Sequence, residues 1–285
     1  LDGLQRELTR SDEVYAERFR PIVVAWRLTI AGHIRELEET VERRQEIDNP
    51  YVIGVPLTAE QEVFVGRVSI SRRIEDLLLD RRKPPLLLYG QRRMGKTSLL
   101  NNLGRLLPNR ILPLFVDLQG HVSHTSGLAG FYYNIARSMV RSAEQQRQIA
   151  VPLYQREMFT DDPLSVFEEW LDELEEAAWR AGSHTILLAL DEFETLAEVL
   201  VSGGLNEAAV LGSLRLLIQH RSRFKVLLAG SHTLQEFHRW SGYFINAQVV
   251  HIGYLQEEEA RRLIERPIKN FSLRYEPAAV QRVLE

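Results

Sequence analysis

The fold is decided by one stretch of sequence, Leu86-Leu87-Leu88-Tyr89-Gly90-Gln91-Arg92-Arg93-Met94-Gly95-Lys96-Thr97. From Gly90 onward it matches the pattern G-x-x-x-x-G-K-[ST]. An apolar run typical of a buried strand precedes the match, and a helical pattern follows to about Leu107. Such a loop curls so that successive backbone N–H groups face one anion, and the helix adds the positive end of its dipole. The stretch therefore predicts a phosphate-binding loop.

Two side chains of this loop have the chemistry that a nucleotide with magnesium requires. The Lys96 ammonium would reach the β and γ phosphates, and the Thr97 hydroxyl would take one position on an octahedral Mg²⁺. Arg92 and Arg93 either contact phosphate or a partner, or are solvated loop charges. The residues expected to bind nucleotide here are Gly90, Gln91, Arg92, Arg93, Met94, Gly95, Lys96, Thr97 and Ser98.

A second apolar run, Thr185 to Leu190, ends in two acids, Asp191 and Glu192. Parallel sheets bind ligands beyond the carboxyl ends of their strands, so Asp191 is expected beside the phosphate loop as a magnesium ligand. Glu192 would orient or deprotonate the attacking water as the general base. The alternative for both is an acid that caps a helix, and Glu194 is expected to start that helix.

A third strand end carries Gly230-Ser231-His232-Thr233. Ser231 is expected to hydrogen-bond the γ phosphate; alternatively, Ser231 or Thr233 caps a helix at Leu234 to Trp240. Any of three nearby arginines would serve as a charge-neutralising finger, and the sequence does not choose among them. These are Arg221, Arg223 and Arg239.

Short apolar strands alternate with amphipathic helices through the middle of the chain, which predicts an α/β fold with a parallel sheet covered on both faces. The expected strands are Leu86–Tyr89, Ile111–Asp117, Thr185–Leu190, Lys225–Ala229 and Gln248–Ile252. The expected helices between them are Lys96–Leu107, Gly127–Glu144, Pro163–Ala181, Glu207–His220 and Leu234–Trp240.

Both ends of the chain have a different pattern. Apolar residues at spacings of four and three predict one long amphipathic helix from Asp12 to about Ile47. This helix packs on its own domain, dimerises as a coiled coil, or leads to an upstream region. Gln256–Glu265 and Glu276–Glu285 read as two helices of a truncated lid. We therefore expect three parts, a helical segment (1–49), an ATPase domain (50–254) and the beginning of a lid (255–285), within a longer protein.

The motif series resembles the STAND class of P-loop ATPases, in the wider AAA+ branch. It consists of Phe64-Val65-Gly66-Arg67, the Gly90 loop, Asp191-Glu192 and the strand end at Gly230. The resemblance implies a P-loop NTPase three-layer sandwich with strand order 5-1-4-3-2, a helical lid and often a winged helix. It also implies that ATP or ADP with Mg²⁺ controls conformation or oligomerisation.

By the same resemblance, Val65, Gly66 and Arg67 would lie beside the adenine or close its pocket, and Pro267 in the lid would touch the base. The alternative for each is a surface turn. Many members of the class have an arginine just after the fourth strand, where this sequence has Ser231-His232. That departure weakens the expectation of γ-phosphate sensing at this position.

Composition removes several other functions. The net charge is −4 and the pI is about 6.1, so charge gives no support for binding nucleic acid or an anionic membrane. The chain has no cysteine, which excludes disulfides and thiol nucleophiles and favours a cytoplasmic location. We see neither a signal peptide nor an apolar run of membrane-spanning length. His121 and His124 are expected in a solvated loop rather than at a metal.

We expect an ATPase that hydrolyses ATP slowly and acts as a signalling switch. Such a protein can form a homo-oligomer, and its sensor and effector regions are expected outside this sequence. Asp117-Leu118-Gln119-Gly120 matches the GTPase pattern D-x-x-G, but no Asn-Lys-x-Asp accompanies it, so we interpret it as a turn. The remaining alternatives are a DNA-associated ATPase resembling origin-recognition and helicase-loading proteins, and a scaffold that holds nucleotide without hydrolysis.

Overall fold

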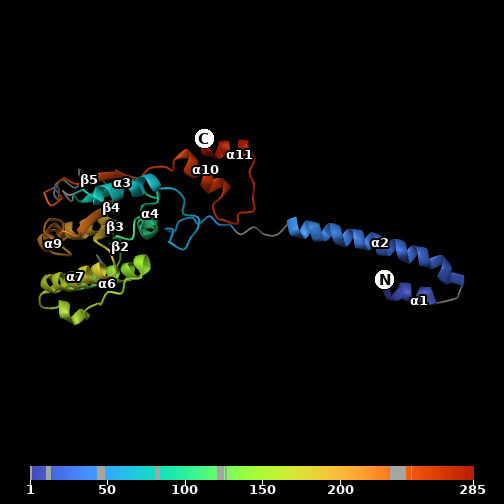
Figure 1. Ribbon diagram of the computed structural model, residues 1–285, viewed down its shortest axis with the longest axis horizontal. Coiled ribbons are helices and arrows are strands. Elements are labelled where there is room, and N and C mark those ends of the chain that lie inside the picture. Colours follow the sequence, from blue (N-terminus) through green and yellow to red (C-terminus); the bar gives the residue numbers. More distant parts are fainter. Residues whose placement is uncertain are drawn as a thin grey trace. The chain divides into compact units, whose positions relative to one another are not determined.

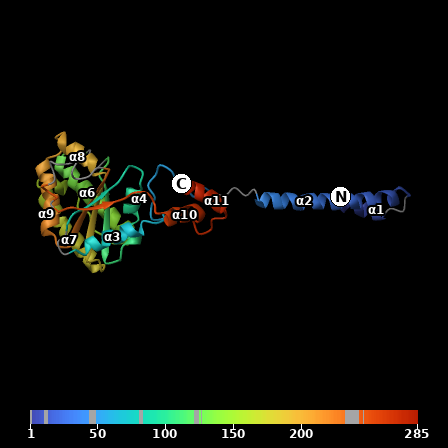
Figure 2. The same ribbon diagram turned by 90° about the horizontal axis from the view of Figure 1, so that it is seen from above.

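The computed structural model describes residues 2–10, 14–43, 49–80, 84–120, 125, 127–231, 242–244 and 246–285. The chain forms two compact units, Leu1–Asn49 and Pro50–Glu285, which are drawn in Figures 1 and 2. Several expectations fall outside the described residues, namely those for His121, His124, His232, Thr233, Arg239 and a helix at Leu234 to Trp240.

The second unit is built on a five-stranded sheet in which every pair of neighbouring strands is parallel. Its strands are β1 (Leu86–Tyr89), β2 (Ile111–Asp117), β3 (Thr185–Asp191), β4 (Phe224–Gly230) and β5 (Gln248–His251). Their order is β2-β3-β4-β1-β5. Counted from the other edge this is 5-1-4-3-2, so the expected fold class and strand order are confirmed.

Alternate side chains of the strands enter two separate cores, which is why the strands read as continuous apolar runs. Leu114 and Leu188 belong to one core, and Leu88 and Leu227 belong to the other. Helices α6 (Gly127–Arg147), α7 (Pro163–Arg180), α8 (Phe193–Val201) and α9 (Glu207–His220) contribute to the first core. Helices α3 (Val68–Leu78), α4 (Lys96–Asn101) and α5 (Leu103–Leu106) contribute to the second. The result is the three-layer arrangement visible in Figure 1.

One expected helix is interrupted. The stretch from Lys96 to Leu107 forms α4 and α5 rather than a single helix, with a break at Asn102. The Asn102 side chain is fully buried and donates to the carbonyl of Ser98 at 2.8 Å and to that of Leu57 at 3.4 Å. An Asn side chain that bonds nearby backbone competes with regular helix geometry. The break therefore fixes the segment before Phe64 against α4.

Two short helices follow the sheet, α10 (Glu257–Glu265) and α11 (Pro277–Leu284). Between β2 and α7 the chain also forms a short 3-10 helix, η1 (Arg156–Phe159). The segment after Pro50 packs on α10, where the Tyr51 hydroxyl donates to the carbonyls of Leu263 at 3.2 Å and Ile264 at 3.1 Å.

The first unit is a pair of helices, α1 (Asp2–Arg10) and α2 (Val14–Arg43). Sequence spacing anticipated α2 but not α1. Pro21 lies inside α2 rather than in its first turn. It is exposed, so water can satisfy the carbonyl that a proline leaves without a donor. Across the described residues no helix has both the length and the hydropathy needed to cross a membrane.

Candidate nucleotide site

The loop that follows β1 has the geometry of a phosphate cradle. Gly95 is left-handed, with φ 84°, and so is Arg93, with φ 67°. A side chain at Gly90 would collide with the backbone carbonyl of Ile252, so the loop is pressed against the chain that leaves β5. Gln91, Arg92 and Arg93 point to solvent, whereas Met94 and Gly95 are half-buried. The loop thus exposes one side while its two glycines set the turn and its packing.

Lys96 is buried and its ammonium is folded back on the loop. Nζ donates to the carbonyls of Gly90 at 2.8 Å and Gln91 at 3.1 Å, and only 6% of the residue is exposed. A desolvated ammonium held by carbonyl groups is a concentrated positive charge. It is therefore placed at the loop that the sequence predicts to hold phosphate.

Thr97 and Asp191 meet although they lie far apart in sequence. Thr97 Oγ1 donates a 2.6 Å hydrogen bond to Asp191 Oδ2, which joins the first turn of α4 to the end of β3. Asp191 is 1% exposed, and burial raises the pKa of its carboxyl to about 6, against the effect of the Thr97 hydrogen bond. Within the described part of the chain, Asp191 Oδ1 is buried and accepts no hydrogen bond. A hydroxyl and a carboxylate with an unpaired buried oxygen are donors that suit Mg²⁺.

Glu192 occupies the turn between β3 and α8. It is the N-cap of α8 and has φ 51°, a left-handed conformation that non-glycine residues seldom adopt and that clusters at functional sites. Its side chain is half-buried. Burial raises the pKa of its carboxyl, repulsion from Glu194 adds to this, and the charges of Lys96 and Arg92 oppose it. The carboxylate therefore lies within the electrostatic influence of the phosphate loop.

Ser231 is held by a residue that the sequence analysis did not place in the site. Its backbone N–H and its hydroxyl both donate to Glu194 Oε1, the latter at 2.6 Å. A side chain at Gly230 would collide with the same carboxylate. Glu194 lies in the first turn of α8, as expected, but no sequence pattern indicated that it reaches the end of β4.

Arg67 links the phosphate loop to the chain that leaves β5. Its guanidinium donates to the carbonyls of Gly253 at 2.8 Å, Tyr254 at 3.3 Å and Met94 at 2.9 Å. Its backbone N–H donates to Glu259 of α10 at 2.8 Å. Arg67 is 8% exposed, and burial lowers its pKa. It is a buried brace between these segments rather than a residue of an exposed turn.

Val65 opens onto a cavity of about 720 Å³ between the segment before α3 and the segment after β5. Phe64 and Pro267 line the same cavity, together with Arg105 and Arg262 among its charged residues. This volume lies within the range of small-molecule pockets, about 300–1,000 Å³. The cavity brings together Val65 and Pro267, which the resemblance assigns to the adenine.

Two other expected positions have partners elsewhere. Ser98 Oγ accepts the backbone N–H of Leu57 at 3.0 Å, so the described contact of Ser98 is with the segment before α3. Asp117 Oδ1 accepts the N–H of Gln119 at 2.8 Å, and Gly120 is left-handed, which is the geometry of a turn. Asp117 is also directly opposite Asp191 in the β2–β3 register.

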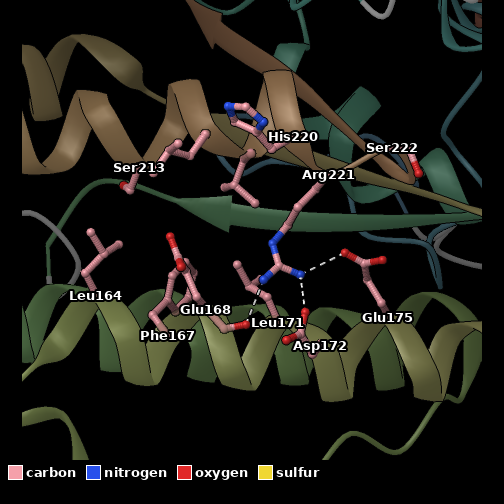
Figure 3. Close-up of a pocket in the computed structure, with 12 residues that line it drawn as sticks. Leu164, Phe167, Glu168, Leu171, Asp172, Glu175, Ser213, His220, Arg221 and Ser222 are labelled. Carbon is pink, nitrogen blue, oxygen red and sulfur yellow. Dashed lines mark hydrogen bonds and ion pairs between the residues drawn. The ribbon is translucent and has the colours of Figure 1, made fainter.

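The described arginine candidates lie before β4, at the opposite end of that strand from Ser231. Arg221 spans a pocket of about 500 Å³ between α7 and α9 (Figure 3). It pairs with Asp172 at 2.6 Å and Glu175 at 2.9 Å. The Arg223 guanidinium lies 4.5 Å from the centre of the Trp179 ring. Both side chains are therefore engaged away from the phosphate loop of their own chain.

Comparison with known proteins identifies the family. Residues 79–237, more than half of the chain, match a family described as an AAA domain, and the chain belongs to this family. It thus carries an AAA-type P-loop ATPase domain, and such domains bind nucleotide. No curated protein sequence matches the chain significantly.

Solved structures include similar folds at low sequence identity. The Walker-type ATPase PABY2304 of Pyrococcus abyssi matches with a TM-score of 0.58 and 16% identity, covering 81% of this chain and 65% of that one. The ORC1 protein of Aeropyrum pernix in complex with DNA matches with a TM-score of 0.43 and 15% identity, covering 72% and 50%. Drosophila ORC bound to GC-rich DNA and Cdc6 matches with a TM-score of 0.45 and 15% identity, covering 92% and 36%. The first of these supports the fold, and this chain spans 65% of its length.

Proposed function

We propose that this chain binds ATP with Mg²⁺ and hydrolyses it slowly, as the switch of a larger signalling protein of the STAND type. The contact between Thr97 Oγ1 and Asp191 Oδ2, with Asp191 Oδ1 buried and without a hydrogen-bond partner among the described residues, is the observation that carries the proposal. Thr97 and Asp191 would hold Mg²⁺, which supplies positive charge against the phosphate oxygens. Lys96 would bind the β and γ phosphates, since its ammonium already lies on the loop.

Glu192 is proposed as the general base. Its left-handed backbone fixes where the carboxylate leaves the end of β3, and the raised pKa makes it a better proton acceptor than an exposed glutamate. Ser231 is proposed as the γ-phosphate contact, with Glu194 as the group that orients its hydroxyl.

The adenine base of ATP would lie in the cavity lined by Phe64, Val65 and Pro267. This cavity is between the proposed ATPase domain (50–254) and the proposed lid (255–285). The hydrogen bond from the backbone N–H of Arg67 to Glu259 crosses the same boundary. Nucleotide in this cavity would therefore favour one placement of the lid over others. A switch requires such a difference in affinity between two arrangements.

Calorimetric titration with ATP and with GTP, each with and without Mg²⁺, tests binding, and phosphate release from the same sample tests hydrolysis. We expect a preference for ATP. Lys96→Ala should weaken binding by about 10- to 100-fold, the range for hydrogen bonds to charged groups. Glu192→Gln should bind normally and release phosphate about 100-fold more slowly or worse.

An equal loss of binding in both variants would refute this division of roles. ATP binding by wild type without phosphate release would replace the hydrolytic switch with a nucleotide-holding scaffold. Identical hydrogen exchange of residues 255–285 with ADP and with a non-hydrolysable ATP analogue would refute the coupling of nucleotide to the lid.

A further inference from the structure

Helix α2 carries an apolar stripe that α1 leaves uncovered. Leu8, Ala16 and Val23 form the small core between the two helices. Beside that core five large apolar side chains remain 47% to 62% exposed, namely Phe19, Trp26, Ile30, Ile34 and Leu37. Contiguous exposed apolar surface of this kind is uncommon on a monomer and marks an interaction site.

Helix α1 lies along the first half of α2 (Figure 1). Arg20 donates to the carbonyl of Leu8 at 2.8 Å, and Arg27 donates to the Gln5 side chain at 2.9 Å. These hydrogen bonds hold α1 to a face of α2 adjacent to Phe19, Trp26 and Ile30. Of the stripe, α1 covers Val23, which is 3% exposed, and leaves Phe19, Trp26, Ile30, Ile34 and Leu37 exposed for a second helix.

The spacing of the stripe reads the same in both directions. In the sequence the apolar positions are 19, 23, 26, 30, 34, 37 and 41, at intervals of 4, 3, 4, 4, 3 and 4. The order is symmetric about Ile30. Two copies of α2 that run antiparallel about Ile30 therefore bring the exposed apolar positions 26 and 34 together, and bring position 37 beside Val23, which α1 already covers. The repeat from 19 to 30 to 41 is eleven residues, which favours a nearly straight pair with a slight right-handed supercoil.

Charge selects the antiparallel direction. Residues 14–28 contain Arg18, Arg20 and Arg27 against Glu17, a net charge of +2 (3 − 1). Residues 32–43 contain two arginines and four glutamates, a net charge of −2 (2 − 4). A parallel pair would place like charges side by side, whereas an antiparallel pair places the basic half of each helix against the acidic half of the other.

We propose that α2 is a self-association helix, which pairs antiparallel with α2 of a second copy of this chain and has Ile30 at the two-fold axis. The interface is isologous, so each copy presents the same stripe. Because Pro50–Glu285 follows α2 in the chain, this pair joins two ATPase domains in one particle. The inference rests on the first unit alone and does not depend on nucleotide chemistry.

The mass of the full 285-residue chain in solution is the first test, by light scattering after size-exclusion chromatography. We expect a dimer. Ile30→Asp should raise the dimer dissociation constant at least about 100-fold, because both copies would bury an unpaired charge at the axis. Leu28→Asp is the matched control, since Leu28 is 70% exposed and lies off the stripe, and it should remain dimeric. A monomeric wild type, or Ile30→Asp with the wild-type mass, would overturn the proposal.

Disulfide trapping tests the direction and does not depend on whether Ile30→Asp folds. The chain has no cysteine, so a single introduced thiol has no competitor. On oxidation, Trp26→Cys mixed with Ile34→Cys should form the mixed disulfide, because positions 26 and 34 face each other in the antiparallel pair. Trp26→Cys alone should form little disulfide. Efficient self-crosslinking of Trp26→Cys without the mixed product would indicate a parallel pair and refute the proposal.

Discussion

Thr97 Oγ1 lies 2.6 Å from Asp191 Oδ2, a contact that joins the first turn of α4, which follows β1, to the end of β3 across the intervening strand β4. The other oxygen of the carboxylate is buried and accepts no hydrogen bond from any residue that the structure describes. A buried acceptor in this state is costly unless a cation or donor satisfies it. A donor or a cation that reaches this oxygen would therefore stabilise the folded chain.

Asp191→Ala should therefore weaken ATP binding in the presence of Mg²⁺ more than ATP binding in its absence. We expect ATP affinity in Mg²⁺ to fall about 10- to 100-fold, the effect of losing a hydrogen-bonded charge, and affinity in EDTA to change little. Lys96→Ala should weaken both. Titration of each variant with and without Mg²⁺ checks the difference. Equal losses for Asp191→Ala in the two conditions would show that Asp191 does not act through the metal.

The raised pKa of Asp191 predicts how stability changes with pH without metal and nucleotide. An unfolded aspartate has a pKa near 3.8, and the folded one is raised to about 6. Between these values the folded state binds more protons, so this group makes the free energy of unfolding fall as pH rises from about 4 to about 6. Well above pH 6 the folded carboxyl is fully ionised, and its loss of stability becomes constant. That loss is on the order of 3 kcal/mol of unfolding free energy, for a pKa raised by about two units.

Asp191→Asn keeps the shape of the side chain and removes the titration. Urea unfolding of both chains at pH 4, 5, 6 and 7 should show Asp191→Asn increasingly more stable than wild type as pH rises, by up to about 3 kcal/mol. Other carboxylates titrate in both chains, so the difference between them isolates Asp191. A pH-independent difference would contradict the assignment.

Sequence was sufficient for the parts of the site that follow from strand ends. Parallel strands bring their carboxyl ends to one edge, so Lys96, Thr97 and Asp191 could be placed together once the apolar runs before them were recognised. The strand order itself came from the resemblance to a family. Apolar periodicity does not distinguish one arrangement of five buried strands from another.

Contacts between distant segments could not be predicted. Asn102, where the helix breaks, donates to the carbonyl of Leu57, and Ser231 donates to Glu194, which lies 37 residues earlier in the chain. The motif singles out Arg67, but its hydrogen-bond acceptors are backbone carbonyl groups. Every residue has such a group, so the sequence does not show which ones Arg67 contacts. Such interactions are specified by tertiary packing rather than by local pattern.

Arg67 braces the phosphate loop against the chain that leads to α10, so its loss should affect both stability and binding. Arg67→Ala leaves the carbonyls of Met94, Gly253 and Tyr254 without this donor, and we expect about 2–3 kcal/mol of destabilisation with weaker ATP binding. Arg67→Lys should recover little, because an ammonium cannot reproduce the planar fork of donors. Thermal unfolding and calorimetry check both quantities.

Arg72, on the exposed face of α3, is the matched control for Arg67. Its replacement by alanine should change stability by no more than about 0.5 kcal/mol and leave ATP affinity unaltered. If Arg67→Ala behaved like Arg72→Ala, the brace would have no energetic role.

Gly90 and Gly212 give opposite predictions for the same substitution. A methyl group at Gly90 would collide with the carbonyl and the side chain of Ile252, which follows β5. Gly90→Ala should therefore lower the free energy of unfolding by about 1–3 kcal/mol through overpacking. Among the described residues, nothing lies within 4 Å of the corresponding position at Gly212, inside α9, so Gly212→Ala should stabilise the chain by about 0.5–1 kcal/mol through helix propensity. Denaturant unfolding of both variants measures the two effects in one domain.

Gly90→Ala should also lose ATP affinity while Gly212→Ala keeps it, since only the first displaces the phosphate loop. A Gly90→Ala chain as stable as wild type would mean that Ile252 yields, and that the close approach of the loop to β5 is not required for the site.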